Sequence, residues 1–361
     1  MFKELDKKME SFINAGVPFC DCIIMRNGEC VYRKVLGYVD SDKKIKATGK
    51  EVYNIYSCTK LMTCIAALML WEQGKFDLED ELYKFMPEFE EMSVLTENGV
   101  KPAENKITIR HLFTMTAGFS YDLDSPMILK CKEETGGSCK TRELMKYLAK
   151  EPLLFEPGTR WQYSLCHDVL AAFVEVISGM TFGEFVKKNI FDVCKMEHST
   201  LLLSDDELGI IANQYRYDDT TNQVKEIERT NQFKLGTDYE SGGAGCISTV
   251  EDYIKMLEAL RTFKLLKKET VELLGANQLT EEQRQLPWYW VEDGRGYGLG
   301  QCSCFDKTVS ADFGWGGAAG ATYFVDIEKG LTMYLGAHVL NFSEYSGLRK
   351  DLTPVIQKIF E

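Results

Sequence analysis

Ser57 and Lys60 lie three residues apart at the start of an almost wholly apolar stretch, residues 61–71. A serine hydroxyl is a poor nucleophile until a base removes its proton. Residues three apart share one face of a helix, about 5–6 Å between Cβ atoms, so the lysine amine can reach the hydroxyl. A helix that is apolar nearly all round is buried, and burial and the positive end of the helix dipole both disfavour a charged ammonium. The pair therefore predicts a nucleophilic serine with a neutral lysine as its base.

The spacing alone is a weak signal, because a Ser-x-x-Lys motif arises about once by chance in a chain of this length. It recurs at Ser41 and Lys44, where the surrounding run is polar and typical of a solvated turn. The alternative for Ser57 is a helix N-cap followed by a surface lysine. The apolar run behind Ser57 is what favours chemistry there.

Composition limits the class of protein and its partners. The chain has 361 residues, of which 45% are hydrophobic and 12% aromatic, enough for a large core in one or two domains. A net charge of −13 and a pI of about 5.0 argue against a nucleic acid or an anionic membrane as partner. Residues 1–10 lack the apolar core of a signal peptide, and no apolar run has the length of a membrane span. We therefore expect a soluble, cytoplasmic protein.

The 12 cysteines are scattered, several of them within apolar runs, which is typical of buried free thiols in a reducing compartment. Two groups are conceivable metal ligands, Cys302 with Cys304 and Cys131 with Cys139. Neither group has the Cys-x-x-Cys or Cys/His spacing of a zinc site. We expect no metal site and no organic cofactor.

The two ends of the chain predict strands of one antiparallel sheet. Asn27-Gly28 is the strongest short hairpin signal and joins the first two expected strands. Hydrophobic periodicity predicts the following terminal elements: helices over 1–16 and 345–360, and strands over 20–25, 30–36, 321–327 and 331–338.

The middle of the chain predicts mostly helices. They are expected over 108–116, 141–150, 165–178, 182–189 and 249–263. The sequence therefore favours an α/β (α+β) fold in which 1–70 and 240–361 form one domain, an antiparallel sheet flanked by the terminal helices. Residues 71–239 form a mainly helical domain, and the active site is expected in the cleft between the two.

Two further segments supply groups that acyl chemistry can use. Tyr163 lies after the turn 156–159 and before a predicted helix, and the run Gly314–Gly320 leads into a predicted strand. Glycine lets the backbone approach another group closely, and a strand edge can present a free N–H to an oxyanion. Taken singly, each has a structural alternative: a core aromatic for Tyr163, and a bulge or tight bend for the glycine run.

Together and in this order, the three segments resemble the penicillin-recognising serine hydrolases, the superfamily of class C β-lactamases, serine DD-peptidases and family VIII esterases. The resemblance runs over most of the chain, from the first hairpin to the last strand. Three other segments are also similar to segments of that superfamily, namely 107–119, 157–164 and 242–253.

The resemblance implies a role for each matched residue. Ser57 matches the nucleophile, Lys60 the adjacent base, and Tyr163 the tyrosine that shuttles a proton between nucleophile, lysine and leaving group. The backbone N–H groups of Ser57 and Ala318 match the oxyanion hole. The positions that match the substrate-binding segments are Trp315, Gly316, Gly317 and Leu165.

Two departures from the pattern decide the branch. The second motif of β-lactamases is Tyr-x-Asn, whereas this chain has Tyr163-Ser164-Leu165. Their third motif begins with Lys or His, where this chain has Trp315, an apolar wall with one N–H in place of a cation for a substrate carboxylate. The resemblance thus implies a small-molecule acyl ester or amide as substrate, an acyl-enzyme on Ser57, and an esterase or acyl transferase. Trp288-Tyr289-Trp290 and Trp315 are candidates for the acyl pocket or for a core cluster.

Other functions stay open. A β-lactamase or DD-peptidase is the alternative within the superfamily, and a non-catalytic binding or sensor domain is the alternative of another class. Such a domain is expected to have lost one of the three motif side chains, and all three are present. A Ser-His-Asp hydrolase needs Gly-x-Ser-x-Gly, which is absent from the sequence, and we interpret His111 and His167 as structural.

Overall fold

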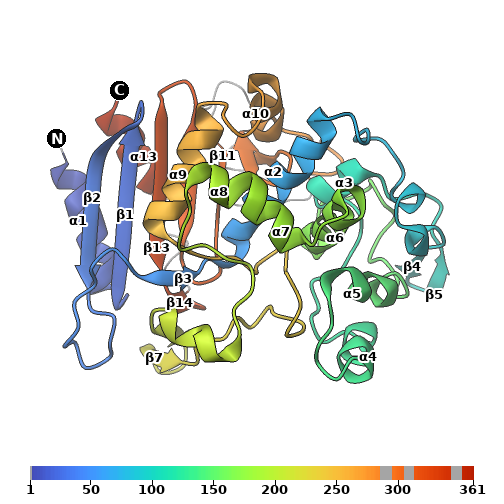
Figure 1. Ribbon diagram of the computed structural model, residues 1–361, viewed down its shortest axis with the longest axis horizontal. Coiled ribbons are helices and arrows are strands. Elements are labelled where there is room, and N and C mark those ends of the chain that lie inside the picture. Colours follow the sequence, from blue (N-terminus) through green and yellow to red (C-terminus); the bar gives the residue numbers. More distant parts are fainter. Residues whose placement is uncertain (1, 285–294, 305–312, 343–351) are drawn as a thin grey trace.

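A seven-stranded antiparallel sheet joins the two ends of the chain in the computed structural model, and both termini lie at the same end of the molecule (Figure 1). The structure describes residues 2–284, 295–304, 313–342 and 352–361. The strands in sheet order are β2 (Glu29–Gly37), β1 (Phe19–Arg26), β13 (Leu331–Ala337), β12 (Thr322–Asp326), β11 (Phe313–Gly316), β10 (Cys302–Cys304) and β9 (Arg295–Tyr297). The predicted α/β fold with an antiparallel sheet built from both ends of the chain is confirmed.

The first hairpin folds as its sequence predicts. Asn27 and Gly28 have φ of +51° and +86°, the left-handed backbone that a type I′ turn requires at both central positions. Cys20 of β1 pairs with Leu36 of β2 on one side and with Ala337 of β13 on the other. Strand β1 therefore links the first and last parts of the chain.

Helices cover both faces of this sheet. They are α1 (Lys3–Asn14) and α13 (Leu352–Ile359) on one face, and α9 (Val250–Arg261) on the other. Tyr32 and Met333 oppose the same residue of β1, and the Tyr32 hydroxyl donates to Asp6 of α1 at 3.1 Å. The next residue of β13, Tyr334, must point the opposite way, because side chains alternate along a strand. It stacks on Tyr253 of α9 with 4.2 Å between ring centroids.

A short two-stranded ribbon stands at the start of two helices. Strand β3 (Val52–Asn54) pairs antiparallel with β8 (Ile247–Thr249), and the Thr249 side chain accepts from the Asp252 N–H to cap α9. The helix predicted to begin at Thr249 is thus confirmed with its cap. The ribbon was not predicted, because strands of three residues are too short to show a period-two pattern.

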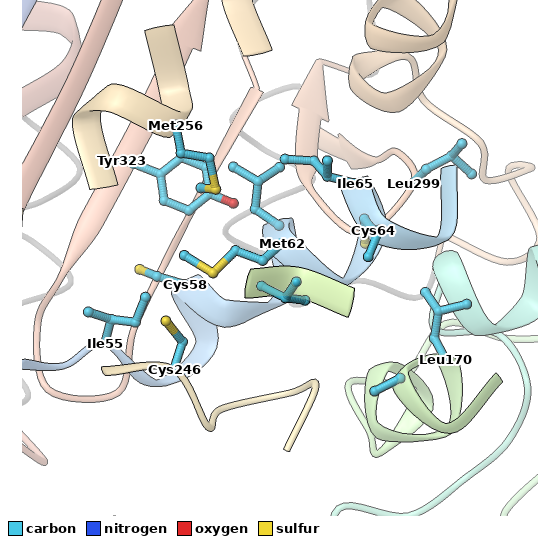
Figure 2. Packing of buried hydrophobic residues seen from close by; sticks show 14 of the residues in the cluster. Ile55, Cys58, Met62, Cys64, Ile65, Leu170, Cys246, Met256, Leu299 and Tyr323 are labelled. Carbon is cyan, nitrogen blue, oxygen red and sulfur yellow. The ribbon is translucent and has the colours of Figure 1, made fainter. Parts of the chain in front are cut away.

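The apolar stretch 61–71 folds into α2 (Thr59–Glu72), the central helix of the molecule. All its residues from the first to Leu68 are buried. In Figure 2, Met62 and Ile65 of α2 lie near Met256 and Tyr323, and Leu170 lies farther away at the lower right. Because α2 has no polar face, its amino end lies inside the protein, as the sequence predicts.

The middle of the chain is mainly helical. Its helical elements are η2 (Leu82–Lys84), η3 (Pro87–Phe89), α3 (Ile109–Phe113), α4 (Pro126–Glu134), α5 (Thr141–Leu148), α6 (Cys166–Ser178), α7 (Phe182–Val186), the π-helical η4 (Lys187–Phe191), α8 (Asp192–Cys194) and η5 (Asp205–Ile210), and α10 (Lys268–Gly275) follows α9. Its strands are β4 (Ser93–Thr96), β5 (Gly99–Pro102), β6 (Gln214–Asp218) and β7 (Gln223–Ile227). In Figure 1, α4, α5 and α6 lie at the end of the molecule away from the termini.

Two helices differ in length from the prediction. Helix α3 ends at Phe113 because Met115, with φ of +58°, leaves the helical region. The helix that begins at Phe182 runs on through η4 to Cys194, and Lys195 ends it with φ of +56°.

The division into two domains stays a prediction. Strand β6, from the segment 71–239, pairs in parallel with β14 (Val339–Leu340), through Tyr215 and Val339. Together with β7 these strands form a three-stranded sheet that draws on both predicted domains.

No single helix in the described parts of the chain is long and apolar enough to cross a membrane. Helix α6 and the segment Phe182–Cys194 reach the length and apolar composition of a membrane span only when taken together, and they are bent by 77° relative to each other. Most of α6 is buried in the protein core.

Candidate active site

Ser57 lies in a strained turn that β3 delivers to the start of α2. The preceding residue, Tyr56, has φ of +49°, and a left-handed backbone costs a non-glycine residue about 1–2 kcal/mol. Burial holds Tyr56 there, together with its hydroxyl, which donates to Gln214 Oε1 at 2.5 Å. Backbone strain of this kind gathers at functional sites. The turn, η1 (Tyr56–Cys58), leaves Ser57 8% exposed at the amino end of α2.

Lys60 is fully buried, and its amine is held between two oxygens. Its Nζ donates to the carbonyl oxygen of Gly243 at 2.7 Å and lies 3.4 Å from Ser57 Oγ. It also faces the ring of Tyr163 at 4.5 Å from the centroid, a cation–π distance. The serine and lysine predicted to share a helix face therefore meet.

A buried carboxylate lies beside this amine. A Cβ atom on Gly243 would sit 2.4 Å from Asp168 Oδ2 and 3.4 Å from Lys60 Nζ. The backbone at Gly243 can therefore lie this close to both side chains only because glycine has no side chain of its own. Asp168 Oδ1 accepts from the Tyr239 hydroxyl at 2.8 Å and from Ser241 Oγ at 2.7 Å. These two donors fix the position of the Asp168 carboxyl group.

Tyr163 reaches the same serine from a different part of the chain. Its hydroxyl donates to Ser57 Oγ at 2.7 Å. Two residues later, the Leu165 N–H donates to the carbonyl oxygen of Ser120 at 3.2 Å and so fastens the segment. The Leu165 side chain is buried in the hydrophobic core. Its predicted place beside the substrate stays a prediction.

Aromatic rings support Tyr163. Trp315 of β11 stacks on it with centroids 5.6 Å apart and planes at 23°. Tyr121 lies 5.2 Å away on the chain segment after α3, and Tyr297 meets Trp315 edge-on at 5.5 Å. The tryptophan at the place of the superfamily's cation thus gives this part of the site an apolar, aromatic wall.

The end of β11 comes against the turn that carries the nucleophile. A Cβ atom on Gly317 would lie 2.3 Å from the carbonyl oxygen of Ile55, so glycine is what permits this approach. The preceding residue, Gly316, pairs with Thr322 at the end of the strand. In the described parts of the chain, the N–H groups of Ser57 and Ala318 donate to no protein acceptor. Two unpaired N–H groups beside a nucleophile suit an oxyanion.

The two histidines interpreted as structural hold backbone groups. His111 Nδ1 accepts from the Thr108 N–H at 3.1 Å and closes the capping box of α3. His167 Nε2 lies 3.3 Å from the carbonyl oxygen of Phe113. Burial lowers the pKa of His111 to about 4 and that of His167 to about 3, where the positive charge of Lys60 adds to the effect. Both imidazoles are therefore neutral at physiological pH.

Other expected features fall elsewhere. Trp288-Tyr289-Trp290 lies outside the described residues. Cys131 Sγ and Cys139 Sγ approach to 2.8 Å in the interior. Within the ranges that the structure describes, no three side chains of His, Cys, Asp or Glu gather as metal ligands do.

Sequence reasoning missed two residues of the site, Asp168 and Tyr121. Asp168 carries a signal, because it is the one carboxylate among the buried residues of α6. Tyr121 follows the matched segment 107–119 and carries no comparable signal. It is brought to the site by the backbone pairing between Ser120 and Leu165.

Comparisons with known proteins place the chain among enzymes. The Beta-lactamase family model matches residues 14–347. The chain is 27% identical to esterase EstB of Burkholderia gladioli over 92% of its own length and 87% of that protein. It is 27% identical to acyltransferase calJ of Penicillium decumbens over 83% and 79% of the two chains. The solved structure of EstCE1, a hydrolase with promiscuous acyltransferase activity, superposes with a TM-score of 0.79 at 23% identity over 97% of both chains.

Proposed function

Because the chain belongs to the beta-lactamase family, we propose that it is a serine hydrolase that acts on small-molecule acyl esters or amides through an acyl-enzyme on Ser57. One observation carries the proposal: Ser57 Oγ lies 2.7 Å from the Tyr163 hydroxyl and 3.4 Å from Lys60 Nζ. A nucleophile within reach of two proton-handling groups is what covalent acyl transfer requires.

Acylation begins when Ser57 Oγ attacks the acyl carbon of the substrate. For this step Tyr163 first gives its phenol proton to a neutral Lys60 amine, which faces its ring at 4.5 Å. The Tyr163 phenolate then takes the serine proton. The carbonyl oxygen becomes an oxyanion, which the N–H groups of Ser57 and Ala318 stabilise. The intermediate then collapses, the bond to the alcohol breaks, and Tyr163 returns the proton to the leaving oxygen.

Deacylation repeats these steps with another nucleophile. A water molecule or a second alcohol attacks the Ser57 ester, gives its proton to Tyr163, and passes through a second oxyanion in the same place. Ser57 Oγ then leaves and takes the proton back. Water as the acceptor makes the protein an esterase, and an alcohol makes it an acyl transferase.

The aromatic wall favours uncharged esters over β-lactams. A β-lactam or peptide substrate presents a carboxylate, which a lysine or histidine would bind, and Trp315 offers none of that charge. Leu165 likewise lacks the amide of the β-lactamase motif. Two of the relatives, EstB and calJ, are named as an esterase and an acyltransferase, which supports the same branch.

Three probes test the proposal on the wild-type protein and on Ser57→Ala. A fluorophosphonate reports nucleophilicity, p-nitrophenyl butyrate reports ester turnover, and nitrocefin reports β-lactam turnover. We expect labelling and ester turnover that the substitution abolishes. Faster turnover of nitrocefin than of the ester would favour a β-lactamase. Absence of both labelling and turnover would favour the non-catalytic binding domain.

A further inference from the structure

Tyr121 is a second phenol beside the nucleophile, and the mechanism above leaves it unused. Its phenol lies close to the Ser57 hydroxyl, which already accepts hydrogen bonds from Tyr163 and Lys60. Its ring centroid lies 5.2 Å from that of Tyr163 and 5.5 Å from Lys60 Nζ. Two tyrosines therefore flank one serine hydroxyl, and the lysine amine faces the rings of both.

The backbone holds Tyr121 in this place. The carbonyl oxygen of Ser120 accepts from the Leu165 N–H at 3.2 Å, which brings the segments of the two tyrosines together. Three residues before Tyr121, Gly118 has φ of +92°, and a Cβ atom on it would lie 2.5 Å from the carbonyl oxygen of Phe155. Only glycine fits there, so the approach of Tyr121 to the site is fixed by the fold.

The two phenols differ in the task that their surroundings allow. Burial raises the pKa of Tyr121 well above its ordinary value, and the charges of Tyr163 and Asp168 push it the same way, whereas the nearby Ser57 hydroxyl opposes them. The phenol therefore keeps its proton at neutral pH. A phenol that keeps its proton is a hydrogen-bond donor and not a base.

We propose that Tyr121 is a further catalytic residue, whose phenol donates a hydrogen bond to Ser57 Oγ and stabilises the negative charge that this oxygen carries during reaction. The inference rests on the proposed function. Ser57 Oγ carries that charge twice, as it attacks the substrate and as it leaves the acyl-enzyme. No bond to Tyr121 forms or breaks, because the serine proton passes to Tyr163 and the phenol proton stays in place.

Tyr121→Phe removes the donor and keeps the ring. One hydrogen bond to a charged oxygen corresponds to a loss of about ten- to a hundredfold in rate. We expect this loss both in the rate of fluorophosphonate labelling, which reports only the attack of Oγ, and in kcat for p-nitrophenyl butyrate. KM and Tm should not change, because the substituted group touches the reacting oxygen and not the substrate.

Tyr53→Phe is the matched control. Tyr53 is equally a buried tyrosine, but it lies in β3 against Phe19, and its hydroxyl has no partner among the described residues. The labelling and turnover rates of Tyr53→Phe should equal those of the wild type. A 3-fluorotyrosine at position 121 keeps the ring and makes the phenol a stronger donor, so its labelling rate should equal or exceed that of the wild type.

Each outcome decides the matter. If Tyr121→Phe labels and turns over at the wild-type rates, Tyr121 is not catalytic, and the proposed function still stands on the wild-type activity. A loss confined to KM, or a fluorotyrosine variant as slow as Tyr121→Phe, would show a structural role and overturn the inference. A wild-type protein that neither labels at Ser57 nor turns over the ester would overturn both proposals.

Discussion

Gly317→Ala tests whether the end of β11 forms the oxyanion hole with the nucleophile turn. A Cβ atom at Gly317 would lie 2.3 Å from the carbonyl oxygen of Ile55, and real Cβ contacts are essentially never shorter than 3.0 Å. The strand and the turn must therefore separate by about 0.7 Å or more. The Ile55 carbonyl also accepts from the Cys58 N–H at 3.2 Å, so its displacement passes to the turn that carries Ser57.

The expected loss follows from this displacement. The N–H groups of Ser57 and Ala318 stand on opposite sides of the gap that the methyl group widens. Loss of one oxyanion donor costs about 2.7–4 kcal/mol, or about 10²- to 10³-fold in kcat. A misplacement of about 1 Å alone costs up to about 10²-fold. We therefore expect kcat for p-nitrophenyl butyrate to fall by about 10²-fold, with a smaller change in KM.

The assay compares steady-state kinetics and thermal unfolding of the wild type, Gly317→Ala and Gly209→Ala. Gly209→Ala adds the same methyl group where there is room for it, because nothing lies within 4 Å of a Cβ atom at position 209. Its kcat should equal that of the wild type. Kinetics are measured well below the Tm of each variant, so that unfolding does not contribute. A folded Gly317→Ala with wild-type kcat would refute the placement of the oxyanion hole between β11 and the turn.

Three further predictions follow from single side chains. Tyr163→Phe should lower kcat by about 10²- to 10⁴-fold without lowering Tm, because the ring still stacks on Trp315 while the proton shuttle is lost, and near-normal kcat would remove Tyr163 from the mechanism. Burial lowers the pKa of His338 to about 4, and its Nε2 accepts from the Asn54 N–H at 3.3 Å, so the unfolded chain takes up this proton first as pH falls. The free energy of unfolding that depends on an uncharged His338 is complete above the unfolded pKa of about 6.5 and is lost progressively down to about 4. The Tm of His338→Gln should therefore depend less on pH across this window than the Tm of the wild type. Parallel curves of Tm against pH for the two proteins would contradict this. Among the cysteines whose exposure the structure describes, Cys30 alone is exposed, so a thiol reagent should modify the native protein fastest at Cys30, and an unchanged fast phase in Cys30→Ser would contradict this.

The parts of the site that lie close in sequence are the parts that sequence reasoning finds. Ser57 and Lys60 are one helical turn apart, so helix geometry alone brings them together, and the structure places them 3.4 Å apart. Tyr163 is 106 residues from the serine, and only resemblance to a superfamily pointed to it. The first hairpin was predictable for the same local reason, because Asn27 and Gly28 specify its turn without help from the rest of the chain.

What the sequence does not reveal depends on contacts between distant segments. Asp168 and Lys60 both lie close to Gly243, and the backbone bond between Ser120 and Leu165 brings Tyr121 to the site. Neither contact has a spacing that a pattern could report. The ribbon of β3 and β8 was missed for a related reason, since its stability comes from pairing between segments almost two hundred residues apart.

The most direct test of the account is the mass of the protein during turnover. Acid quenching of a reaction with p-nitrophenyl butyrate should trap a fraction of the protein carrying one added butyryl group. Digestion should place that group on the peptide containing Ser57, and Ser57→Ala should carry none. Ester turnover at the wild-type rate by Ser57→Ala, or turnover by the wild type with the butyryl group on another residue, would contradict the central claim that Ser57 is the nucleophile.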